Sequence, residues 1–401
     1  MLKTVGEMKT LLRVAIMNML MMLPLVTFAG EGGGAVVRAV RRVLTFIDSM
    51  AVSGVDRRYI GVPGRPWQVV VRGNVNRASL TMSSTIDAGE IFADLTSSYV
   101  SEPRITSGND AYIGAWGGYR GYGLGYMHQV SGSGRGSLFT LGATGGSYGV
   151  NFRRHSFETD EFDIYNEWHQ ADGTSHSETF TTGLLEAIKV KSFILDGYYM
   201  FNGSRYSYAA AYDQSAYQLR SAGSLMVGGM YYYSNIDYET PLNAGMIMMM
   251  DNIGRLRQWQ VSLGAGYAYN YVPARGVLIS GMLMPMLTLY NRLKIYRFDS
   301  KMRQMGLDNH VYGEDDQVQL LIQAIADPSV MEMKPLPENP VQTENSRVRL
   351  NFNARASLTY NLGDRAYLNV YGQLYNFRFS HDDNHGALTE WFANSSIGVR
   401  F

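Results

Sequence analysis

Histidine and serine are the residue types from which this chain would have to build a nucleophilic site. It has seven histidines and no cysteine, which excludes a thiolate nucleophile and a cysteine-ligated zinc. On a strand, an imidazole and a hydroxyl share a face when they are two residues apart. No histidine has serine at that spacing; His155 and Ser156, like His176 and Ser177, are adjacent and face opposite sides. A dyad between two strands, for example at His128, stays open.

Three other clusters match loose binding patterns. The glycines from Gly121 to Gly125 lie in a strand-like run with tyrosines between them, so a phosphate-binding loop is not predicted. Two clusters offer possible ligands for a divalent metal. They are His381, Asp382, Asp383 and His385, and Asp160, Glu161, Asp163 and Glu167. Both are more typical of solvated loops, and the ligand order of a known calcium loop is missing. We predict neither a metal nor a cofactor.

The most informative polar side chains are arginines. Arg347, Arg349 and Arg355 are separated by even numbers of residues, so they would share one face of a strand. We expect Arg120 and Arg400 to face the same interior. Such an arginine lining could attract anionic solutes into a narrow pore. Alternatively, each arginine could pair with an inward carboxylate, and the side chains would then fill the interior.

The elements that would position these side chains are long strands. From Arg347 to Tyr360, and again from Gln258 to Tyr271, apolar and polar residues alternate over 14 positions. Strands of soluble proteins have about 5–6 residues. The 28 tyrosines gather near expected strand ends, as at 267–271. Long alternating strands with aromatic ends are typical of transmembrane β-barrels, in which a closed sheet pairs every backbone group.

Both ends of the chain favour the same class. Residues 1–29 have a basic start, an apolar stretch and small residues at Thr27 and Ala29, the order of a secretory signal peptide. An uncleaved transmembrane helix is the alternative, although the stretch is short for one. The last strand alternates from Trp391 to a terminal Phe401. This ending resembles the signal that the outer-membrane insertion machinery reads. We therefore expect that machinery and outer-membrane lipids as partners, and the cell outer membrane as the location.

The predicted fold is all-β: a transmembrane, antiparallel, up-and-down barrel of about 12 strands. We expect the barrel over 66–401, after a periplasmic segment over 30–65 that contains a short amphipathic helix. A long outer excursion is expected over 291–346, with helical spacing of apolar residues over 315–326. The expected strands are 66–74, 77–85, 110–130, 136–154, 186–200, 205–213, 222–234, 258–271, 276–290, 347–361, 365–379 and 390–401. Ala143 to Ser147 could instead form a turn, which would give thirteen.

Four phrases of the sequence resemble a known family. They are Gly54 to Ile60 with Pro66-Trp67, Trp116 to Tyr126, Gly145 to Asn151, and Phe201 to Ala211 with Arg220 to Ser224. Together they are similar to an uncharacterised family of Bacteroidota outer-membrane proteins, catalogued as domain of unknown function 4421, over about residues 45–401. The resemblance implies a Gram-negative outer-membrane barrel and transfers no functional residue.

Composition narrows the function further. The 35 basic and 35 acidic residues give a net charge of zero, which argues against nucleic-acid binding. We predict a non-enzymatic barrel. Its role would be either the passage of small solutes or that of an envelope scaffold. The alternative is an outer-membrane lipid hydrolase or acyltransferase, which would need a histidine–serine cluster formed across strands at the lipid-facing rim.

Overall fold

The structure is a computed structural model of the chain. It describes residues 41–49 except 43, 53–87, 98–132, 134–169, 174–243, 247, 252–299, 332–345, 349–381 and 384–401, with isolated positions between 301 and 329. Residues 1–53 and 54–401 are two separate compact units. In the first unit, positions 41, 42 and 44–49 are helical, inside the segment for which the sequence predicts a helix. The predicted signal peptide, and most of the helix predicted over 315–326, lie outside the described residues.

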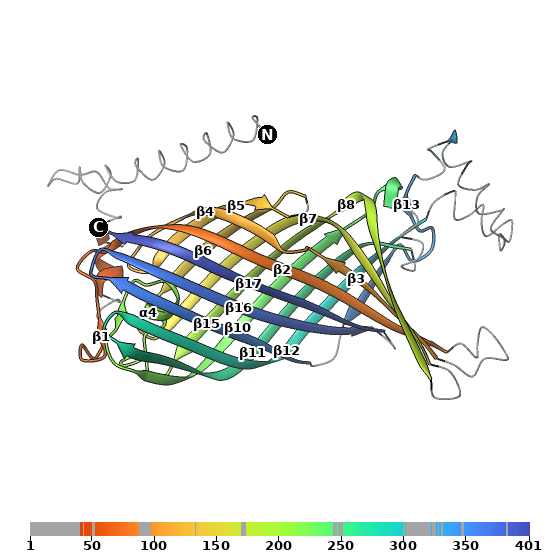
Figure 1. Cartoon of the computed structure of the whole chain (residues 1–401). Coiled ribbons are helices and arrows are strands. Elements are labelled where there is room, and N and C mark those ends of the chain that lie inside the picture. The colour runs from red at the N-terminus through yellow and green to blue at the C-terminus, as the bar shows by residue number, and fades with distance from the viewer. Residues whose placement is uncertain are drawn as a thin grey trace. The chain divides into compact units, whose positions relative to one another are not determined.

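Residues 54–401 fold into a closed antiparallel barrel of twelve strands, which confirms the predicted fold class (Figure 1). The strands are β2 (Trp67–Asp87), β4 (Asp110–Tyr119), β5 (Tyr122–Ser131), β6 (Ser137–Thr144), β7 (Tyr148–His169), β8 (Ser175–Met200), β10 (Ala222–Asp237), β11 (Ile253–Ala274), β12 (Val277–Asp299), β15 (Leu350–Leu362), β16 (Ala366–His381) and β17 (Asn384–Arg400). Each pairs with its neighbours around the wall, and β17 closes the barrel against β2 with Arg400 opposite Gln68.

The wall strands β4, β5 and β6 are short, and a further strand completes the wall beyond their outer ends. β3 (Ser98–Thr106) lies beyond the ends of β4, β5 and β6, where it pairs with β2 on one side and β7 on the other. Thr159 Oγ1 in β7 donates to the Thr106 carbonyl at 2.5 Å at this junction. On the other side of the barrel, β13 (Lys334–Pro335) and β14 (Val341–Asn345) pair with the outer part of β12.

Two of the predicted strands are in fact pairs of strands. Residues 110–130 form a hairpin, because Arg120 and Gly121 have φ of 52° and 89° and make a two-residue turn. Arginine is uncommon in that conformation, so the sequence carried only a weak turn signal. Residues 136–154 also divide, at the turn 145–147, as the alternative reading of that segment allowed.

Two other predictions counted one strand too many each, so the total number of strands stays at twelve. Residues 66–74 and 77–85 belong to one continuous strand, β2. The strand predicted over 205–213 is wrong, because this segment contains helix α4 (Tyr208–Tyr212). Its alternating tyrosines imitate a strand. A run of three alanines and the N-cap Ser207, whose hydroxyl accepts a backbone hydrogen bond, favour a helix instead.

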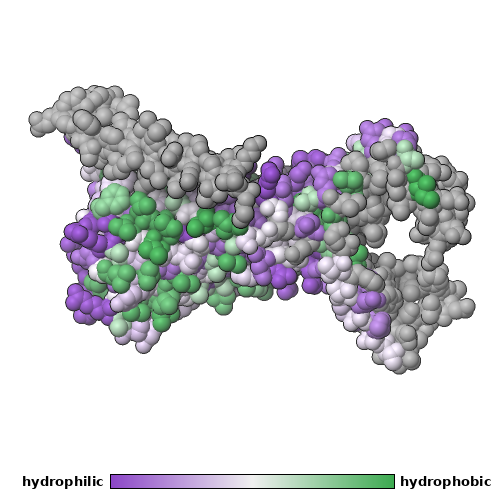
Figure 2. All heavy atoms as spheres, turned by 45° about the horizontal axis from the view of Figure 1, so that its top comes forward, coloured by the Kyte–Doolittle hydropathy of each residue, from purple (hydrophilic) through white to green (hydrophobic). Residues whose placement is uncertain are grey.

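The wall alternates as the sequence predicts, with apolar side chains outside and polar ones inside. In β15, Asn353, Arg355 and Ser357 are buried, while Leu350 and Leu358 are exposed on the outer surface. On the face shown in Figure 2, a hydrophobic band lies between two hydrophilic zones. Of the helices in the described part of the chain, none is long and apolar enough to cross a membrane.

The interior of the barrel is packed with side chains. Tyr208 and Ala211 of α4, and five methionines of β10 and β12, belong to one buried cluster that extends along the lumen. Toward the outer end this cluster continues with bulky apolar residues. They include Leu80, Ile105, Phe157, Phe162, Ile188, Phe298 and Phe377. The core of this protein therefore lies inside the barrel.

Candidate functional site in the barrel lumen

One connection folds back into the barrel and closes one end of the lumen. The end that carries the C-terminus has short turns, such as Arg275–Gly276 between β11 and β12, and outer-membrane barrels have their short turns on the periplasmic side. The connection between β8 and β10, residues 201–221, is much longer. Its helix α4 lies within that end of the barrel (Figure 1), and all five of its residues are buried. We call residues 201–221 the plug.

Side chains from four wall strands hold the plug by its backbone carbonyls. The four bonds are Gln68 in β2 to Asp213 at 3.1 Å, Asn270 in β11 to Ser207 at 3.0 Å, Ser357 in β15 to Ala211 at 2.7 Å, and Arg400 in β17 to Gln214 at 2.8 Å. A buried carbonyl without a donor costs about 1–3 kcal/mol, so these bonds fix the plug at one depth.

The segment before the barrel fastens the plug from the periplasmic side. β1 (Ile60–Gly61) pairs with β9 (Tyr217–Gln218) of the plug. Arg205 and Arg220 of the plug lie over the ring of Tyr59, at 5.2 and 5.9 Å from its centre. Asp56 accepts hydrogen bonds from the side chain and backbone of Arg58, which lower the pKa of its carboxyl to about 2.

A buried ion pair occupies the middle of the lumen. Arg355 Nη2 donates to Asp196 Oδ2 and to the Tyr198 hydroxyl, both at 2.8 Å, and both charged side chains are about 2% exposed. The arginine also bonds to Tyr208 of the plug. Tyr375 donates to the same carboxylate at 3.0 Å. Arg355 is therefore neutralised by a carboxylate from across the barrel, which is one of the two arrangements that the sequence left open.

A second buried network contains a hydroxyl, an imidazole and a carboxylate in order. The Tyr112 hydroxyl lies 2.9 Å from His155 Nε2, and His155 Nδ1 lies 3.5 Å from Glu390, which also accepts from Arg153 at 2.6 Å. This order resembles a nucleophile relay. However, all three groups are at most 2% exposed, and Asn76 Nδ2 lies 3.2 Å from the same Nε2. We interpret the network as a packed structural cluster.

The outer wall has a histidine opposite a serine. His128 in β5 is the direct register partner of Ser137 in β6, and the side chain of His128 is exposed. Within the described residues, this imidazole has no hydrogen bond to the serine and no carboxylate to orient it. The pair therefore lacks the third member that holds a catalytic imidazole in place.

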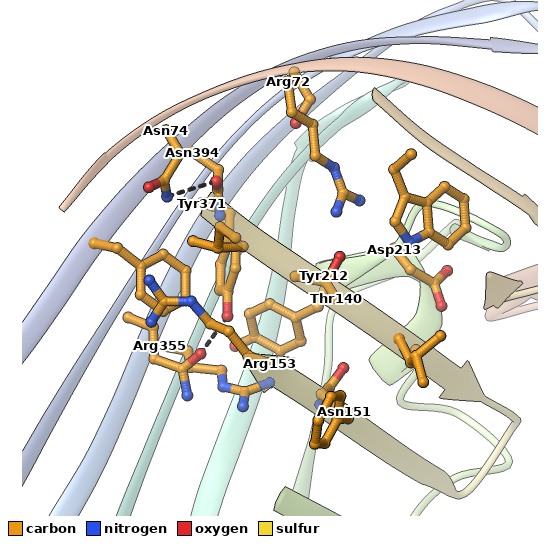
Figure 3. A pocket seen from close by; sticks show the side chains of 18 of the residues that line it. Arg72, Asn74, Thr140, Asn151, Arg153, Tyr212, Asp213, Arg355, Tyr371 and Asn394 are labelled. Atoms are coloured by element: carbon orange, nitrogen blue, oxygen red, sulfur yellow. Dashed lines mark hydrogen bonds between the residues drawn. The ribbon is translucent and has the colours of Figure 1, made fainter. Parts of the chain in front are cut away.

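A polar cavity of about 90 Å³ lies between these networks and the plug (Figure 3). Arg72, Arg153, Arg355, Asp196 and Asp213 contribute charged groups to its lining. The guanidinium of Arg72 points into the space, 5.1 Å from the ring centre of Trp116. In the described part of the chain it has no hydrogen bond and no ion pair. The other two arginines are paired with carboxylates.

Of the five arginines proposed from the sequence, the four that the structure describes do not form one lining. Arg355 and Arg400 are buried in the lumen, at different depths. Arg120 lies in the β4–β5 turn and donates to the Pro63 carbonyl. Arg349 is half-buried just before β15, and Arg347 lies outside the described residues.

Two cavity arginines were missed by the sequence analysis. Arg72 is in phase with Asn74 and Asn76 on the inner face of β2, and the break predicted after residue 74 divided this inward polar run. Arg153 is in phase with His155 on the inner face of β7. The period-two pattern contained both signals, and correct strand limits were needed to read them.

The described residues contain no group of three histidine, aspartate or glutamate side chains placed to hold a metal ion. Of the clusters considered from the sequence, the side chains of residues 381–385 lie outside the described part.

A closed twelve-strand barrel with an apolar outer wall and one set of short turns defines the class: the protein is an outer-membrane β-barrel. The chain belongs to the family described as domain of unknown function (DUF4421), whose model matches residues 96–401. A comparison with curated protein sequences finds no match.

Several solved outer-membrane barrels have a similar fold. The outer membrane protease OmpT from Escherichia coli is 9% identical, with 84% of this chain and 97% of that chain covered and a TM-score of 0.32. The translocator domain of the autotransporter NalP from Neisseria meningitidis is 7% identical, with 91% and 95% covered and a TM-score of 0.29. The toluene transporter TodX of P. putida is 7% identical, with 84% and 90% covered and a TM-score of 0.25. At these values the likeness carries no functional argument.

Proposed function

We propose that this protein is a non-enzymatic envelope scaffold with a closed lumen. The scaffold would act through the two ends of the barrel and its outer wall. The observation that carries the proposal is the plug, which four wall strands hold by its backbone. The apolar cluster in the outer half of the lumen supports it, because such an interior excludes water and ions. The neutralised Arg355 supports it too, because a paired arginine does not attract anions into a pore.

Conductance in planar bilayers tests whether the lumen is closed. We expect no stable current steps from refolded full-length protein whose folding is shown by heat-modifiable mobility. The matched variant replaces residues 202–224 with Asn-Gly. A two-residue turn fits there, because Phe201 N donates to Leu225 O at 3.1 Å across β8 and β10. Stable steps from the unmodified protein would overturn the proposal and support solute passage instead.

A single engineered cysteine also tests whether the lumen is closed, through its reaction with a thiol reagent and without an electrical measurement. The chain has no cysteine of its own, so in the variant Ser280→Cys the new thiol on the inner face of β12 is the only group that reacts with a thiol reagent. Ser280 is 3% exposed and is opposite Asn270, which holds the plug. We expect slow reaction with a charged thiol reagent in the plugged protein and fast reaction in the Asn-Gly variant. Ser131→Cys, at an exposed position, is the positive control.

Binding of a small anion in the luminal cavity is a second candidate function. Arg72 favours it, because its guanidinium points into the cavity without a hydrogen-bond partner among the described residues. Sulfate and phosphate should then raise the unfolding temperature of the protein and not that of Arg72→Gln. Equal shifts in both proteins would exclude this candidate.

The partners expected from the sequence remain part of this proposal. The side chain of Phe401 is 43% exposed, and its backbone N–H donates to the Trp67 carbonyl at 3.0 Å, so the ring is available beside the closing strands. We infer that the insertion machinery recognises this end, and that lipids of the outer membrane cover the apolar wall. Deleting Phe401 should lower the amount of folded protein in the membrane. The Bacteroidota origin implied by the resemblance stays a prediction.

A further inference from the structure

The outer wall carries a group of cations beside a row of aromatic rings. On each of four strands, a basic side chain stands two residues beyond an aromatic one, toward the outer end. The four pairs are Phe152 and Arg154 in β7, Phe193 and Lys191 in β8, Trp259 and Arg257 in β11, and Tyr290 and Arg292 in β12. Lys294 is two residues after Arg292 in β12 and lies on the same face of the strand. We call Arg154, Lys191, Arg257, Arg292 and Lys294 the basic collar.

The members of the basic collar are neighbours across the strands. Lys191 is opposite Asn235, Asn235 is opposite Arg257, and Arg257 is opposite Lys294, so one row crosses β8, β10, β11 and β12. Two cations directly opposite each other, such as Arg257 and Lys294, destabilise a sheet unless an anion lies between them.

No carboxylate of the described chain neutralises this group. Arg257 donates to the neutral oxygens of Asn235 at 2.8 Å and Tyr296 at 3.2 Å. Lys294 lies 5.9 Å from the ring centre of Trp259. Among the described residues, none of the five cations is within ion-pair distance of an acidic side chain.

The next row outward shows that this lack of acids is specific to the basic collar. There, Arg255 is paired with Asp237 at 3.1 Å and Glu239 at 2.6 Å. Lys189 lies 3.7 Å from Glu186. Acidic partners therefore accompany the cations that stand further from the aromatic rings, and they are missing where the wall meets those rings.

The basic collar lies at the height of lipid headgroups. The rings of Phe193, Tyr233 and Trp259 pack together, with centres 5.1 and 5.5 Å apart, above the apolar wall. Tyr269, at the other end of β11, is exposed. The ten residue-to-residue steps from Trp259 to Tyr269 span about 25 Å at about 3.3 Å each and a tilt of about 40°, which is the usual height of the apolar band.

We propose that the basic collar binds a phosphorylated lipid headgroup in the outer leaflet. Arginine and lysine just beyond an aromatic girdle face the phosphate layer, and guanidinium groups bind phosphate with two parallel hydrogen bonds. The row from Lys191 to Lys294 spans three strand spacings, about 14 Å, so a headgroup with two phosphates fits it better than one with a single phosphate. The aromatic rings below contact the first part of the acyl chains.

Lipid binding to the full-length protein tests this site. The protein is placed in phosphatidylcholine nanodiscs and titrated with bisphosphorylated lipid A, with monophosphorylated lipid A as the second probe. The variant Arg257→Gln with Lys294→Gln should bind the bisphosphorylated lipid about 30-fold more weakly, given the usual contribution of two basic residues near an anionic membrane surface. The matched control is Arg77→Gln with Arg378→Gln, which removes the same charge from exposed arginines of β2 and β16 and should change binding less than about threefold.

Three results would overturn the proposal. They are equal weakening in the variant and its control, no weakening in either, and full competition by free inorganic phosphate at the concentration of the lipid. The last result would assign the site to a soluble anion. Heat-modifiable mobility checks folding, and the single variant Lys191→Gln is used if the double variant does not fold. Lys191 is exposed and makes no hydrogen bond in the described chain, and its loss should weaken binding about fivefold.

Discussion

The ion pair between Asp196 and Arg355 offers a quantitative test of a packed lumen. Asp196→Asn keeps the shape of the side chain and removes its charge. The side chain of Arg355 is 2% exposed and would then be a buried cation without a counterion. Breaking one partner of a buried pair typically costs about 3–5 kcal/mol, because the remaining charge stays desolvated. In a water-filled lumen the cost would fall below about 1 kcal/mol, the value of exposed pairs.

Equilibrium unfolding in urea measures this cost. The protein is folded into lipid vesicles, and its tryptophan fluorescence and heat-modifiable mobility are followed together. The matched control is Glu186→Gln, which breaks a pair with Lys189 whose side chains are 38% and 55% exposed. We expect this control to lower the free energy of unfolding by less than about 1 kcal/mol.

A double variant separates lost charge from lost shape. Asp196→Asn with Arg355→Met removes both charges and should recover most of the stability that the single change loses. The reasoning is refuted if the Asp196→Asn loss is no larger than that of Glu186→Gln. It is equally refuted if the double variant is as unstable as the sum of its two single changes, because the two side chains would then not be coupled.

Three other predictions concern the plug, a turn and the periplasmic segment. Ser357→Ala removes the shorter of two hydrogen bonds to the Ala211 carbonyl, which also accepts from Gln214 Nε2 at 3.3 Å. It should lower the unfolding free energy by about 0.5–1.5 kcal/mol, with no effect when the plug is replaced by Asn-Gly. Gly121→Ala should destabilise more than Gly363→Ala in the same urea assay, because both have positive φ but only the first would place a Cβ 2.1 Å from a threonine hydroxyl. The pKa of Asp56 is lowered from 3.8 to about 2 by hydrogen bonds from a neighbouring arginine, so its stabilisation of residues 54–66 is present above about pH 4 and is lost as the pH falls through 2. Asp56→Asn should remove that pH dependence from amide exchange in the segment; an unchanged profile would contradict this.

The wall was predictable because its information is local. In β11 and β15, each residue's face follows from whether its position is odd or even, and the burial pattern agrees over both strands. Turns were harder to predict where the residue type gave no signal. Arg120 adopts positive φ in a two-residue hairpin that usually selects asparagine or aspartate, so that hairpin was taken for one strand.

The lumen was less predictable because its contacts join distant parts of the chain. Arg355 and Asp196 are 159 residues apart, and Arg153 and Glu390 are 237 residues apart. Strand phase shows that each of these side chains faces inward, but it does not give the depth at which two inward residues meet. That depth depends on the stagger between strands and on the plug, whose helix the alternating tyrosines concealed.

Within the part of the chain that the structure describes, two of the luminal arginines are paired with carboxylates, whereas the basic collar on the outer wall is not, and this difference bears on the proposed function. Inside, Arg153 and Arg355 are paired with carboxylates, which weakens the field that would draw anions through the barrel, although Arg72 has no ion pair in the described chain. Outside, the basic collar has no acidic partner among the described residues, although the whole chain has as many acidic as basic residues. At the proposed lipid site, the positive field of the basic collar would point into the headgroup layer. This arrangement supports the two proposals above, a scaffold with a closed lumen and a lipid site on its outer wall, over the alternative of solute passage.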